Sequence, residues 1–414
     1  DYKVTGVQTC ALPISPPRRI IPGDAAASSL FQLLVAKSAE DRMPQKAEPL
    51  PKAAIDRIAR WINEGARFDG PRELESQPLW EVIPPRDYPP APPLYPRPAP
   101  VTALAFNADS SKLFSSGRNE VLVWDAVSGA LTGRFGQLPE RIYDIQVSSN
   151  GEWIVVAGGT PAQHGETRLL DSRTGRFLRS LASSADAFLC ARFTPNGEHV
   201  LLGGADASLR LVRVSDGARL WQSEAHSDWV QSVAASPDGA WCAAASRDKT
   251  AKVFSLASGE LTAIFSEHSQ PVASISFLPG SDSILSVGRD RKALWWPGPG
   301  RTNATPEIER KKSRELAGII EEPRKMLVES NSIFLAGGNG FIAEYDLSQT
   351  NLKHNLKGQR DWVESLAWDK RTRKLAAGAQ DGRIAIWRLE TAASTAKDIE
   401  PSLVFLAQPK KTAQ

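Results

Sequence analysis

Residues 226–254 read HSDWVQSVAASPDGAWCAAASRDKTAKVF. A polar turn, SPDG at Ser236–Gly239, separates an apolar segment from the small-residue segment CAAAS, and the stretch ends on the aromatic Phe254. Short apolar runs bounded by turns that contain Gly and Asp are typical of antiparallel β-strands. The stretch therefore predicts consecutive short strands joined by tight turns.

The same pattern recurs along the chain at a nearly fixed period. Strand-ending positions equivalent to Phe254 are separated by 46, 42, 42, 42, 49 and 42 residues. A period of about 40–45 residues with four strands per unit is typical of a β-propeller. We therefore predict an all-β fold, a seven-bladed β-propeller over residues 95–407, preceded by a small α-helical fragment. The repeated positions are Trp124, Leu170, Val212, Phe254, Trp296, Tyr345 and Trp387.

A propeller needs a strand that completes its last blade, because an open sheet would leave an exposed edge. We expect LVFLA at Leu403–Ala407 to be that strand, with LWEVI at Leu79–Ile83 as the alternative. Small residues at Ala243–Ala245 and Gly203–Gly204 suit the narrow space near a propeller axis. The first strand of the sixth unit is hard to place within residues 316–328.

Several motifs in these units resemble WD repeats. They are LVWD at Leu122–Asp125, EYD at Glu344–Asp346, AIW at Ala385–Trp387, and the GRD and AQDG turns. The resemblance covers the propeller region. It implies a scaffold that binds protein partners rather than an enzyme.

His226, Ser246 and Asp248 are the residue types of a nucleophilic triad. The WD resemblance implies a structural use instead, in which a histidine hydrogen-bonds a turn aspartate with support from a serine and an aromatic. The set recurs, so we interpret it as blade architecture and identify no catalytic residue, although a propeller-based hydrolase or lyase is an alternative. Unit five has His268, Asp290 and Trp296 with Gly288 at the serine position, and unit seven has Asp381 and Trp387 with Gln359 for histidine.

The composition argues against several other function classes. Lys plus Arg total 50 against 47 for Asp plus Glu, so the net charge of +3 predicts no nucleic-acid partner. The basic run RKKSR at Arg310–Arg314 is interpreted as solvated. The histidines lack the spacing of zinc sites, no GxxxxGK[ST] loop occurs, and no apolar run approaches the ~18 residues of a membrane span. Cys190 and Cys242 lie in apolar runs, which predicts buried thiols.

In WD propellers, the residues that flank the first-strand apolar anchor and the residue before the turn aspartate face one end of the channel. Aromatic and arginine side chains at such positions favour energetic hot spots of binding. The paired DWV motifs at Asp228–Val230 and Asp361–Val363 are the strongest signal. The predicted interaction surface consists of Trp229, Gln231, Trp362, Glu364, Arg141, Tyr143, Arg247, Arg289 and Gln380.

The first fifteen residues, DYKVTGVQTCALPIS, show no periodicity, and VTGVQTCALPI resembles a translated sequencing adapter. We therefore expect residues 1–15, which include Cys10, to be foreign to the native protein and an upstream part to be missing. Residues 71–94 are rich in proline and predict an extended, semi-rigid linker. Residues 408–414 form a polar tail.

Two amphipathic helices are predicted within residues 16–70. Leu30, Leu33 and Leu34 have helical spacing in the first. The second follows Pro51, and Gly65 is placed to stop it. Its apolar stripe consists of Ile55, Ile58, Ala59 and Ile62.

The motif series IIPGD, SSLFQLLV, RMP, PL and IDRIARWINEGA resembles the C-terminal part of a planctomycete-type cytochrome c domain. The resemblance implies that Met43 is the second axial ligand of a haem iron, and thioether ligation opposite histidine is sound chemistry. The attachment motif C-x-x-C-H is absent, so this chain attaches no haem covalently, and the resemblance places the motif upstream in an intact parent. It further implies haem c, a redox partner and a periplasmic or otherwise extracytoplasmic location. The alternative is a cytoplasmic WD scaffold without haem.

Overall fold

The structure is a computed structural model of the 414-residue chain. It describes residues 20–38, 40–44, 48–67, 86–280, 283–299, 314–316, 318–348, 350–389 and 398–409. The predicted foreign segment 1–15, the alternative closing strand Leu79–Ile83 and most of the RKKSR run lie outside these residues. The chain divides into two compact units, Asp1–Pro78 and Leu79–Gln414. No helix within the described residues is long and apolar enough to cross a membrane.

The first unit contains both predicted helices, α1 (Ser29–Leu34) and α2 (Lys52–Asn63). Leu34 and Ile62 supply their buried apolar contacts, at 6% and 0% exposed. Gly65 adopts a φ of +101°, the left-handed conformation that favours glycine just beyond a helix, and its N–H donates to the Ile62 carbonyl at 3.0 Å. The apolar stripe read from the sequence therefore marks the side that is buried.

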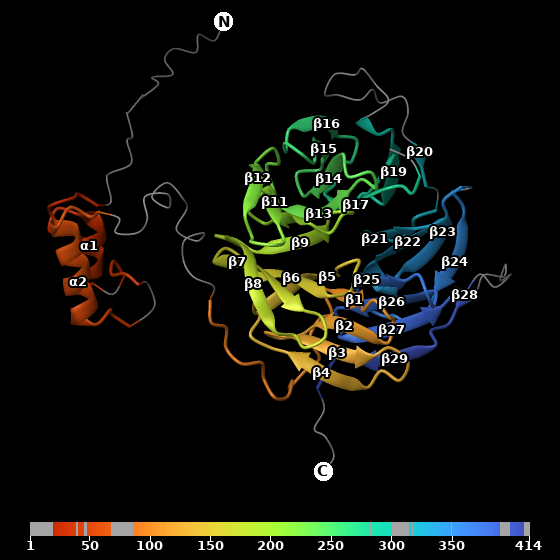
Figure 1. The fold of residues 1–414 in the computed structure, drawn as a ribbon, viewed down its shortest axis with the longest axis horizontal. Coiled ribbons are helices and arrows are strands. Elements are labelled where there is room, and N and C mark those ends of the chain that lie inside the picture. The colour runs from red at the N-terminus through yellow and green to blue at the C-terminus, as the bar shows by residue number, and fades with distance from the viewer. Residues whose placement is uncertain are drawn as a thin grey trace, which may run out of the picture. The chain divides into compact units, whose positions relative to one another are not determined.

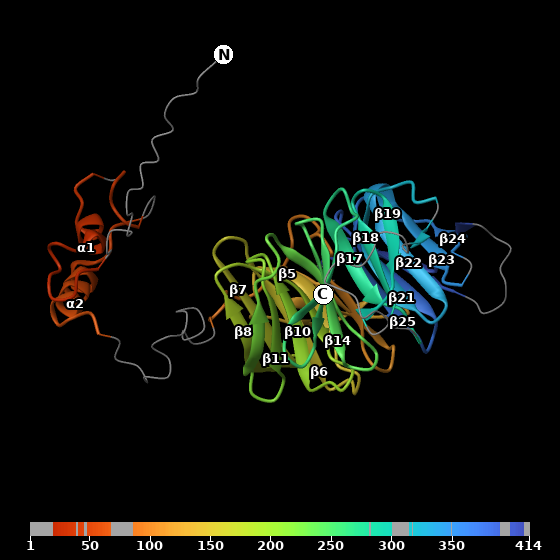
Figure 2. The same ribbon diagram turned by 90° about the horizontal axis from the view of Figure 1, so that it is seen from above.

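The second unit consists of seven sheets around a common axis, blades A to G in chain order (Figures 1 and 2). In six of these sheets, all strand pairings are antiparallel. Strands that are neighbours in these sheets also follow one another in the chain, except for the last strand of blade G. Blade A has β1 (Leu104–Phe106), β2 (Lys112–Ser116), β3 (Val121–Asp125) and β4 (Leu131–Phe135). Blade B has β5 (Arg141–Val147), β6 (Trp153–Thr160), β7 (His164–Asp171) and β8 (Phe177–Ser184). Blade C has β9 (Phe188–Phe193), β10 (His199–Gly204), β11 (Leu209–Arg213) and β12 (Arg219–Ser223).

The remaining four blades follow the same plan. Blade D has β13 (Val230–Ala235), β14 (Trp241–Ser246), β15 (Ala251–Ser255) and β16 (Leu261–Phe265). Blade E has β17 (Val272–Phe277), β18 (Ile284–Gly288), β19 (Lys292–Trp296) and β20 (Arg314–Glu315). Blade F has β21 (Pro323–Glu329), β22 (Ser332–Gly337), β23 (Ile342–Asp346), β24 (Leu352–Leu356) and a fifth strand, β28 (Asp398–Ile399), parallel to β24. Blade G has β25 (Val363–Asp369), β26 (Lys374–Ala379), β27 (Arg383–Arg388) and β29 (Leu403–Leu406).

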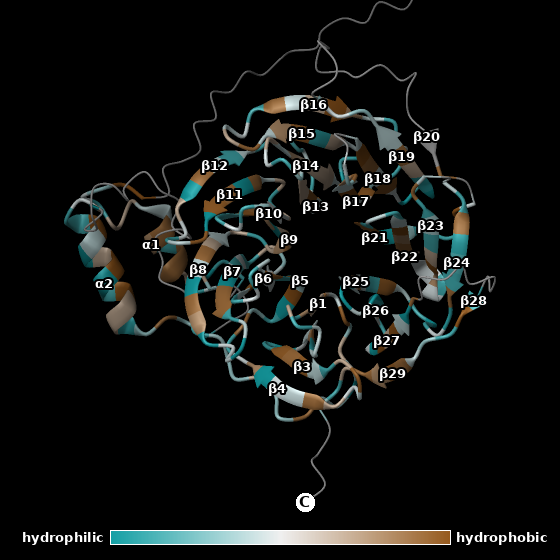
Figure 3. Cartoon of the chain, turned by 45° about the vertical axis from the view of Figure 1, so that its right-hand side comes forward, coloured by the Kyte–Doolittle hydropathy of each residue, from teal (hydrophilic) through white to brown (hydrophobic). Residues whose placement is uncertain are grey.

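The seven repeated positions of the sequence all lie in the third strand of a blade. Each faces a buried residue of the second strand, as Phe254 faces Cys242 and Trp387 faces Leu375. All seven are at most 3% exposed. Burial of one such side chain stabilises the fold by about 1.5–3 kcal/mol, which explains why this position carries the clearest repeat signal. Figure 3 shows the mixed apolar and polar residues along outer strands such as β4 and β16.

The ring closes at the strand expected from the sequence. β29 pairs with β27, with Ile384 opposite Phe405, and so completes blade G. The first strand of the sixth unit, which was hard to place from the sequence, is β21, and it begins at Pro323. Proline is tolerated at the first residue of a strand but weakens the sequence signal for one.

A strap formed by residues 86–100 packs along the outer strands of blades A and B, so packing on the propeller begins before residue 95. The Tyr95 hydroxyl donates to Glu120 at 2.6 Å and accepts the Arg118 N–H at 2.7 Å. Arg134 pairs with Glu120 at 2.6 Å and donates to the carbonyls of Pro92 and Pro93. Extended proline-rich backbone has no internal hydrogen bonds, so these arginine contacts satisfy carbonyls that the strap itself cannot.

We predict that Tyr95→Phe destabilises the propeller by about 1–3 kcal/mol, because it leaves the fully buried Glu120 carboxylate without one of its donors. The measurement is urea unfolding followed by tryptophan fluorescence. Tyr143→Phe, at a partly exposed position on β5, is the matched control and should change little. Equal stability of Tyr95→Phe and wild type would show that the strap does not stabilise the ring.

Candidate functional site

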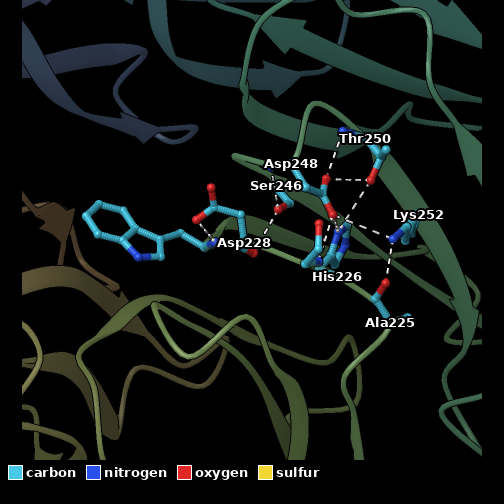
Figure 4. Close-up of polar contacts among 9 residues, drawn as sticks. Ala225, His226, Asp228, Ser246, Asp248, Thr250 and Lys252 are labelled. Atoms are coloured by element: carbon cyan, nitrogen blue, oxygen red, sulfur yellow. Dashed lines mark hydrogen bonds and ion pairs between the residues drawn. The ribbon is translucent and has the colours of Figure 1, made fainter. Parts of the chain in front are cut away.

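A buried polar network joins His226 to the turn of blade D (Figure 4). His226 Nδ1 lies 2.9 Å from Asp248 Oδ2, and the His226 side chain is 1% exposed. Asp248 also accepts the Ser227 N–H at 3.1 Å and the Thr250 hydroxyl at 2.6 Å. The histidine and aspartate therefore fasten the loop before β13 to the β14–β15 turn, as the WD resemblance implies.

Ser246 supports the turn that carries Asp248 and does not contact the histidine. Its hydroxyl donates to the Asp228 carbonyl at 2.9 Å and accepts the Asp248 N–H at 3.0 Å, and Figure 4 shows it turned toward Asp228. His226 Nε2 is buried and has no hydrogen-bond partner among the described residues. A nucleophilic triad requires a serine within hydrogen-bond reach of the base, and these three residues lack that contact.

Blade E shows where the supporting hydroxyl belongs. Ser286 Oγ lies 2.8 Å from His268 Nε2 and accepts the Trp296 indole N–H at 2.8 Å, while His268 Nδ1 lies 3.0 Å from Asp290. Gly288 occupies the position equivalent to Ser246, as the sequence predicts, since Val272 pairs with Gly288 as Val230 pairs with Ser246. A side chain at Gly288 would clash with the His268 ring, and the serine lies two residues earlier.

Blade G departs from the histidine–aspartate contact, as the presence of Gln359 predicts. Gln359 Nε2 donates to the Ala377 carbonyl at 2.8 Å rather than to Asp381. Asp381 accepts the Arg383 N–H at 3.0 Å, and the Trp387 indole donates to the Lys357 carbonyl at 3.0 Å. In blades D, E and G, the predicted structural residues make hydrogen bonds to their own blade or to the loop that leads into it.

Burial sets the protonation of the blade D pair. Burial lowers the pKa of His226 and outweighs the opposing effect of Asp248. Burial alone would raise the pKa of Asp248, but hydrogen bonds from His226 and Thr250 lower it well below its usual range. The pair is thus a neutral imidazole beside a carboxylate near pH 7. Across the residues that the structure describes, no group of three or more His, Cys, Asp or Glu is placed to hold a metal ion.

The two DWV motifs present their tryptophans in the same way. Asp228 Oδ1 accepts the Trp229 N–H at 2.8 Å, and Asp361 Oδ1 accepts the Trp362 N–H at 2.8 Å. The Arg247 guanidinium lies 4.9 Å from the Trp229 ring centroid. Because each tryptophan precedes the buried anchor of a first strand, both lie at the same end of their blades, as predicted.

Two residues that the sequence interpretation missed connect this surface. Arg324 lies over the Trp362 ring at 4.1 Å and pairs with Glu364 at 3.0 Å. Glu322 lies between Arg289, at 3.5 Å, and Arg324, at 3.8 Å. These five residues and the Arg247–Trp229 pair of blade D together form what we call the Arg–Trp face. It consists of Trp229, Arg247, Arg289, Glu322, Arg324, Trp362 and Glu364.

A sequence signal for the missed residues exists. Glu321–Arg324 reads EEPR and aligns with DWVE at Asp361–Glu364, with Pro323 in the place of the valine anchor. Pro323 indeed pairs with Gly337, as Val363 pairs with Ala379. Because proline usually argues against a strand, this strand could not be placed from the sequence. The equivalence of Glu322 and Arg324 to Trp362 and Glu364 was therefore missed.

The other predicted surface residues are divided between positions beside the Arg–Trp face and positions in other blades. Gln231 lines a central cavity of about 540 Å³ between the first strands. Gln380 is exposed, and its N–H donates to the Trp362 carbonyl at 2.8 Å. Arg141 and Tyr143 belong to β5 of blade B, which blade C separates from blade D and blade A separates from blade G.

Met43 is the one predicted ligand in the helical unit. Its N–H donates to the Leu33 carbonyl at 3.0 Å, and the residue is 42% exposed. Residues 16–70 contain neither histidine nor cysteine, so this unit offers a single donor and no thioether attachment. The residues present therefore do not make a haem site by themselves.

Comparison with known proteins agrees with the blade geometry. Residues 217–255, 259–296 and 350–388 match the family model "WD domain, G-beta repeat". The propeller contains WD40 repeats. These matches fall on blades C to G, and WD-repeat propellers typically act as protein-interaction scaffolds.

Curated relatives match parts of the chain. Mouse striatin-4 is 35% identical over 91 residues, which cover 21% of this chain and 12% of that protein. Human THO complex subunit 6 is 26% identical over 176 residues, which cover 39% of this chain and 51% of that protein. Nuclear distribution protein nudF of Aspergillus niger is 22% identical over 304 residues, which cover 72% of this chain and 61% of that protein. The chain thus spans less than two thirds of each of these relatives.

The buried His226 predicts a pH dependence of stability. Its folded pKa is depressed, so the unfolded state binds the proton more readily once the pH falls through the ordinary histidine value of 6.5. Stability should therefore fall between pH 7.5 and pH 5 (roughly one unit above and one and a half below that value). His226→Gln, with the residue that blade G uses at this position, should flatten the profile in urea unfolding. An unchanged slope in His226→Gln would contradict the assignment.

Proposed function

We propose that the propeller is a protein-interaction scaffold whose partner binds on the Arg–Trp face. Tryptophan and arginine dominate binding hot spots because they combine a large contact area with directed hydrogen bonds. Trp229 is 37% exposed although it is large and apolar. Trp229 and the partly buried Trp362, each with an arginine guanidinium over its ring, supply the kind of surface that such anchors form.

The face is preorganised for binding. Carboxylates hold its arginines in place: Glu364 holds Arg324, and Glu322 contacts both Arg324 and Arg289. A side chain that is already fixed loses less conformational entropy when a partner binds. The face therefore favours one partner geometry over nonspecific adsorption.

The environment of Arg289 indicates which polar group the partner supplies. Burial and the neighbouring charge of Arg324 lower its pKa, and its Nε atom is buried with no hydrogen-bond partner among the described residues. The Nε atom lies 3.5 Å from Glu322 Oε1, so a carbonyl or carboxylate oxygen from a partner would bond the exposed part of this guanidinium. The name of THO complex subunit 6 states that this relative is part of an assembly, which agrees with a scaffold. That the chain is not an enzyme stays a prediction.

The test is quantitative affinity capture from extracts of the source cells with wild-type, Trp229→Ala and Trp362→Ala protein. We expect each variant to lose about tenfold or more of the specific partner, because a hot-spot truncation costs about 2 kcal/mol or more. Val127→Ala is the matched control, since Val127 is a 73% exposed apolar residue in the β3–β4 turn. Equal capture by all four proteins, each with native circular dichroism, would refute the proposed face.

For the intact parent we propose a c-type haem module coupled to this scaffold, with Met43 as axial ligand and an extracytoplasmic location. The support is the motif series of residues 16–70 and the exposure of Met43, whose thioether is free of the helical core. Haem bound there would supply electron transfer. The proposal requires an upstream C-x-x-C-H segment, and it does not affect the assignment of the propeller face.

The test uses the parent protein with its upstream coding sequence. We predict that Met43→Ala alters the visible spectrum of the oxidised haem and lowers its reduction potential, because a thioether ligand favours the reduced metal. Met326→Leu, at the chain's other methionine, is the matched control, since Met326 lies in the blade E–F core. An upstream sequence without C-x-x-C-H, or an unchanged spectrum, would eliminate the haem module and its redox partner.

A further inference from the structure

The boundaries between neighbouring blades show a recurring packing feature. A ring from one blade covers the turn glycine between the third and fourth strands of the next. Phe135 of blade A covers Gly175 of blade B, Trp221 of blade C covers Gly259 of blade D, and Phe405 of blade G covers Gly129 of blade A. These glycines have φ values of +71° to +73°, and a Cβ on any of them would meet the ring. At the next boundary, Phe265 of blade D stacks on the Trp296 ring of blade E instead of on a glycine, with ring centroids 4.6 Å apart.

The boundary between blades B and C lacks this ring. The turn glycine there is Gly217, and its nearest neighbours are backbone atoms of Ser180 and Leu181. By strand register, Arg179 faces Leu169 as Trp221 faces Leu211, and Ala182 faces Thr167 as Phe135 faces Val121. Blade B thus has an arginine and an alanine at the two positions from which neighbouring blades supply the ring.

A groove of about 1000 Å³ opens at this boundary. Its apolar lining includes Trp153, Leu178 and Val214, which belong to or pack on the blade B–C core. Its charged lining is basic on balance, with Arg176, Arg179 and Arg213 against one carboxylate, that of Glu198. Of the three arginines, only Arg213 has an acidic partner among the described residues, Asp216 at 2.7 Å. Arg179 Nε is buried and has no hydrogen-bond partner there.

We propose that this groove, which we call the B–C groove, is a second binding site that takes a short acidic peptide segment carrying an aromatic residue. The aromatic ring would pack on Trp153, Leu178 and Val214, the apolar lining of the groove. Acidic side chains would pair with the guanidinium groups of Arg176 and Arg179, because charge-assisted hydrogen bonds are stronger than neutral ones. The site is separate from the Arg–Trp face, which belongs to blades D to G.

Fluorescence anisotropy with labelled peptide pools tests the site. One pool contains short peptides in which a single Phe is flanked by Asp and Glu, a second replaces Phe with Ala, and a third replaces the acids with Lys. We expect saturable binding of the first pool alone, and affinity at least about tenfold weaker for the second. Binding of all pools alike, no binding of the first, or equal binding of heparin would overturn the proposal.

Variants of the chain locate the site. Arg179→Trp copies Trp221 of the next blade, so it should abolish binding and raise Tm because it also removes an unpartnered buried donor. Arg176→Glu, at an exposed position, should abolish binding without a change in Tm. Arg360→Ala, an exposed arginine outside the groove, is the charge control and should bind like wild type. Retained binding in both groove variants would place the peptides elsewhere, and Trp362→Ala should leave this binding unchanged even if the Arg–Trp face proves wrong.

Discussion

Packing between neighbouring blades is the interaction on which the rest of this propeller depends. A four-stranded sheet cannot bury its apolar surface alone, so each blade buries it against the next one, as when Ile142 of blade B packs with Phe114 of blade A. The ring must therefore close, and β29 on β27 closes it beside blade A, where Phe405 meets Trp124 with ring centroids 5.0 Å apart. The strap adds a second bond across this closure, since Gln408 donates to the Tyr95 carbonyl at 2.6 Å.

The same constraint determines what the sequence can and cannot predict. The third-strand positions are fully buried in every blade, so a large residue recurs there and the blade count follows from the period. The exact blade network is less visible, because Ser246 and Ser286 are both serines of a second strand yet only Ser286 contacts a histidine. Two positions that lie two residues apart on a strand point to the same face of the sheet, so the alternation pattern and the residue type do not distinguish them. Only the hydrogen-bond geometry shows which serine contacts the histidine.

Local sequence patterns gave incomplete predictions at two segments that contain proline. Pro323 begins a strand although proline usually argues against one, and that concealed Arg324 and Glu322 beside the predicted Trp362. The proline-rich segment likewise predicts an extended, semi-rigid linker, but Tyr88 stacks on His164 and lies under Arg168 of blade B. In both cases long-range contacts, which carry no periodicity, decide the role of the proline.

Once closure and core are satisfied, departures from the repeat become informative about function. The Arg–Trp face departs by its composition, since blade C places Ala187 and Leu189 where blade D places Trp229 and Gln231. The B–C groove departs by an omission, since Arg179 stands where a ring would otherwise complete the boundary. A guanidinium whose Nε is buried without a partner costs stability, and a fold that already closes its ring gains nothing from it. The arginine at this position is explained if a bound segment supplies both an aromatic ring and an anion at this boundary.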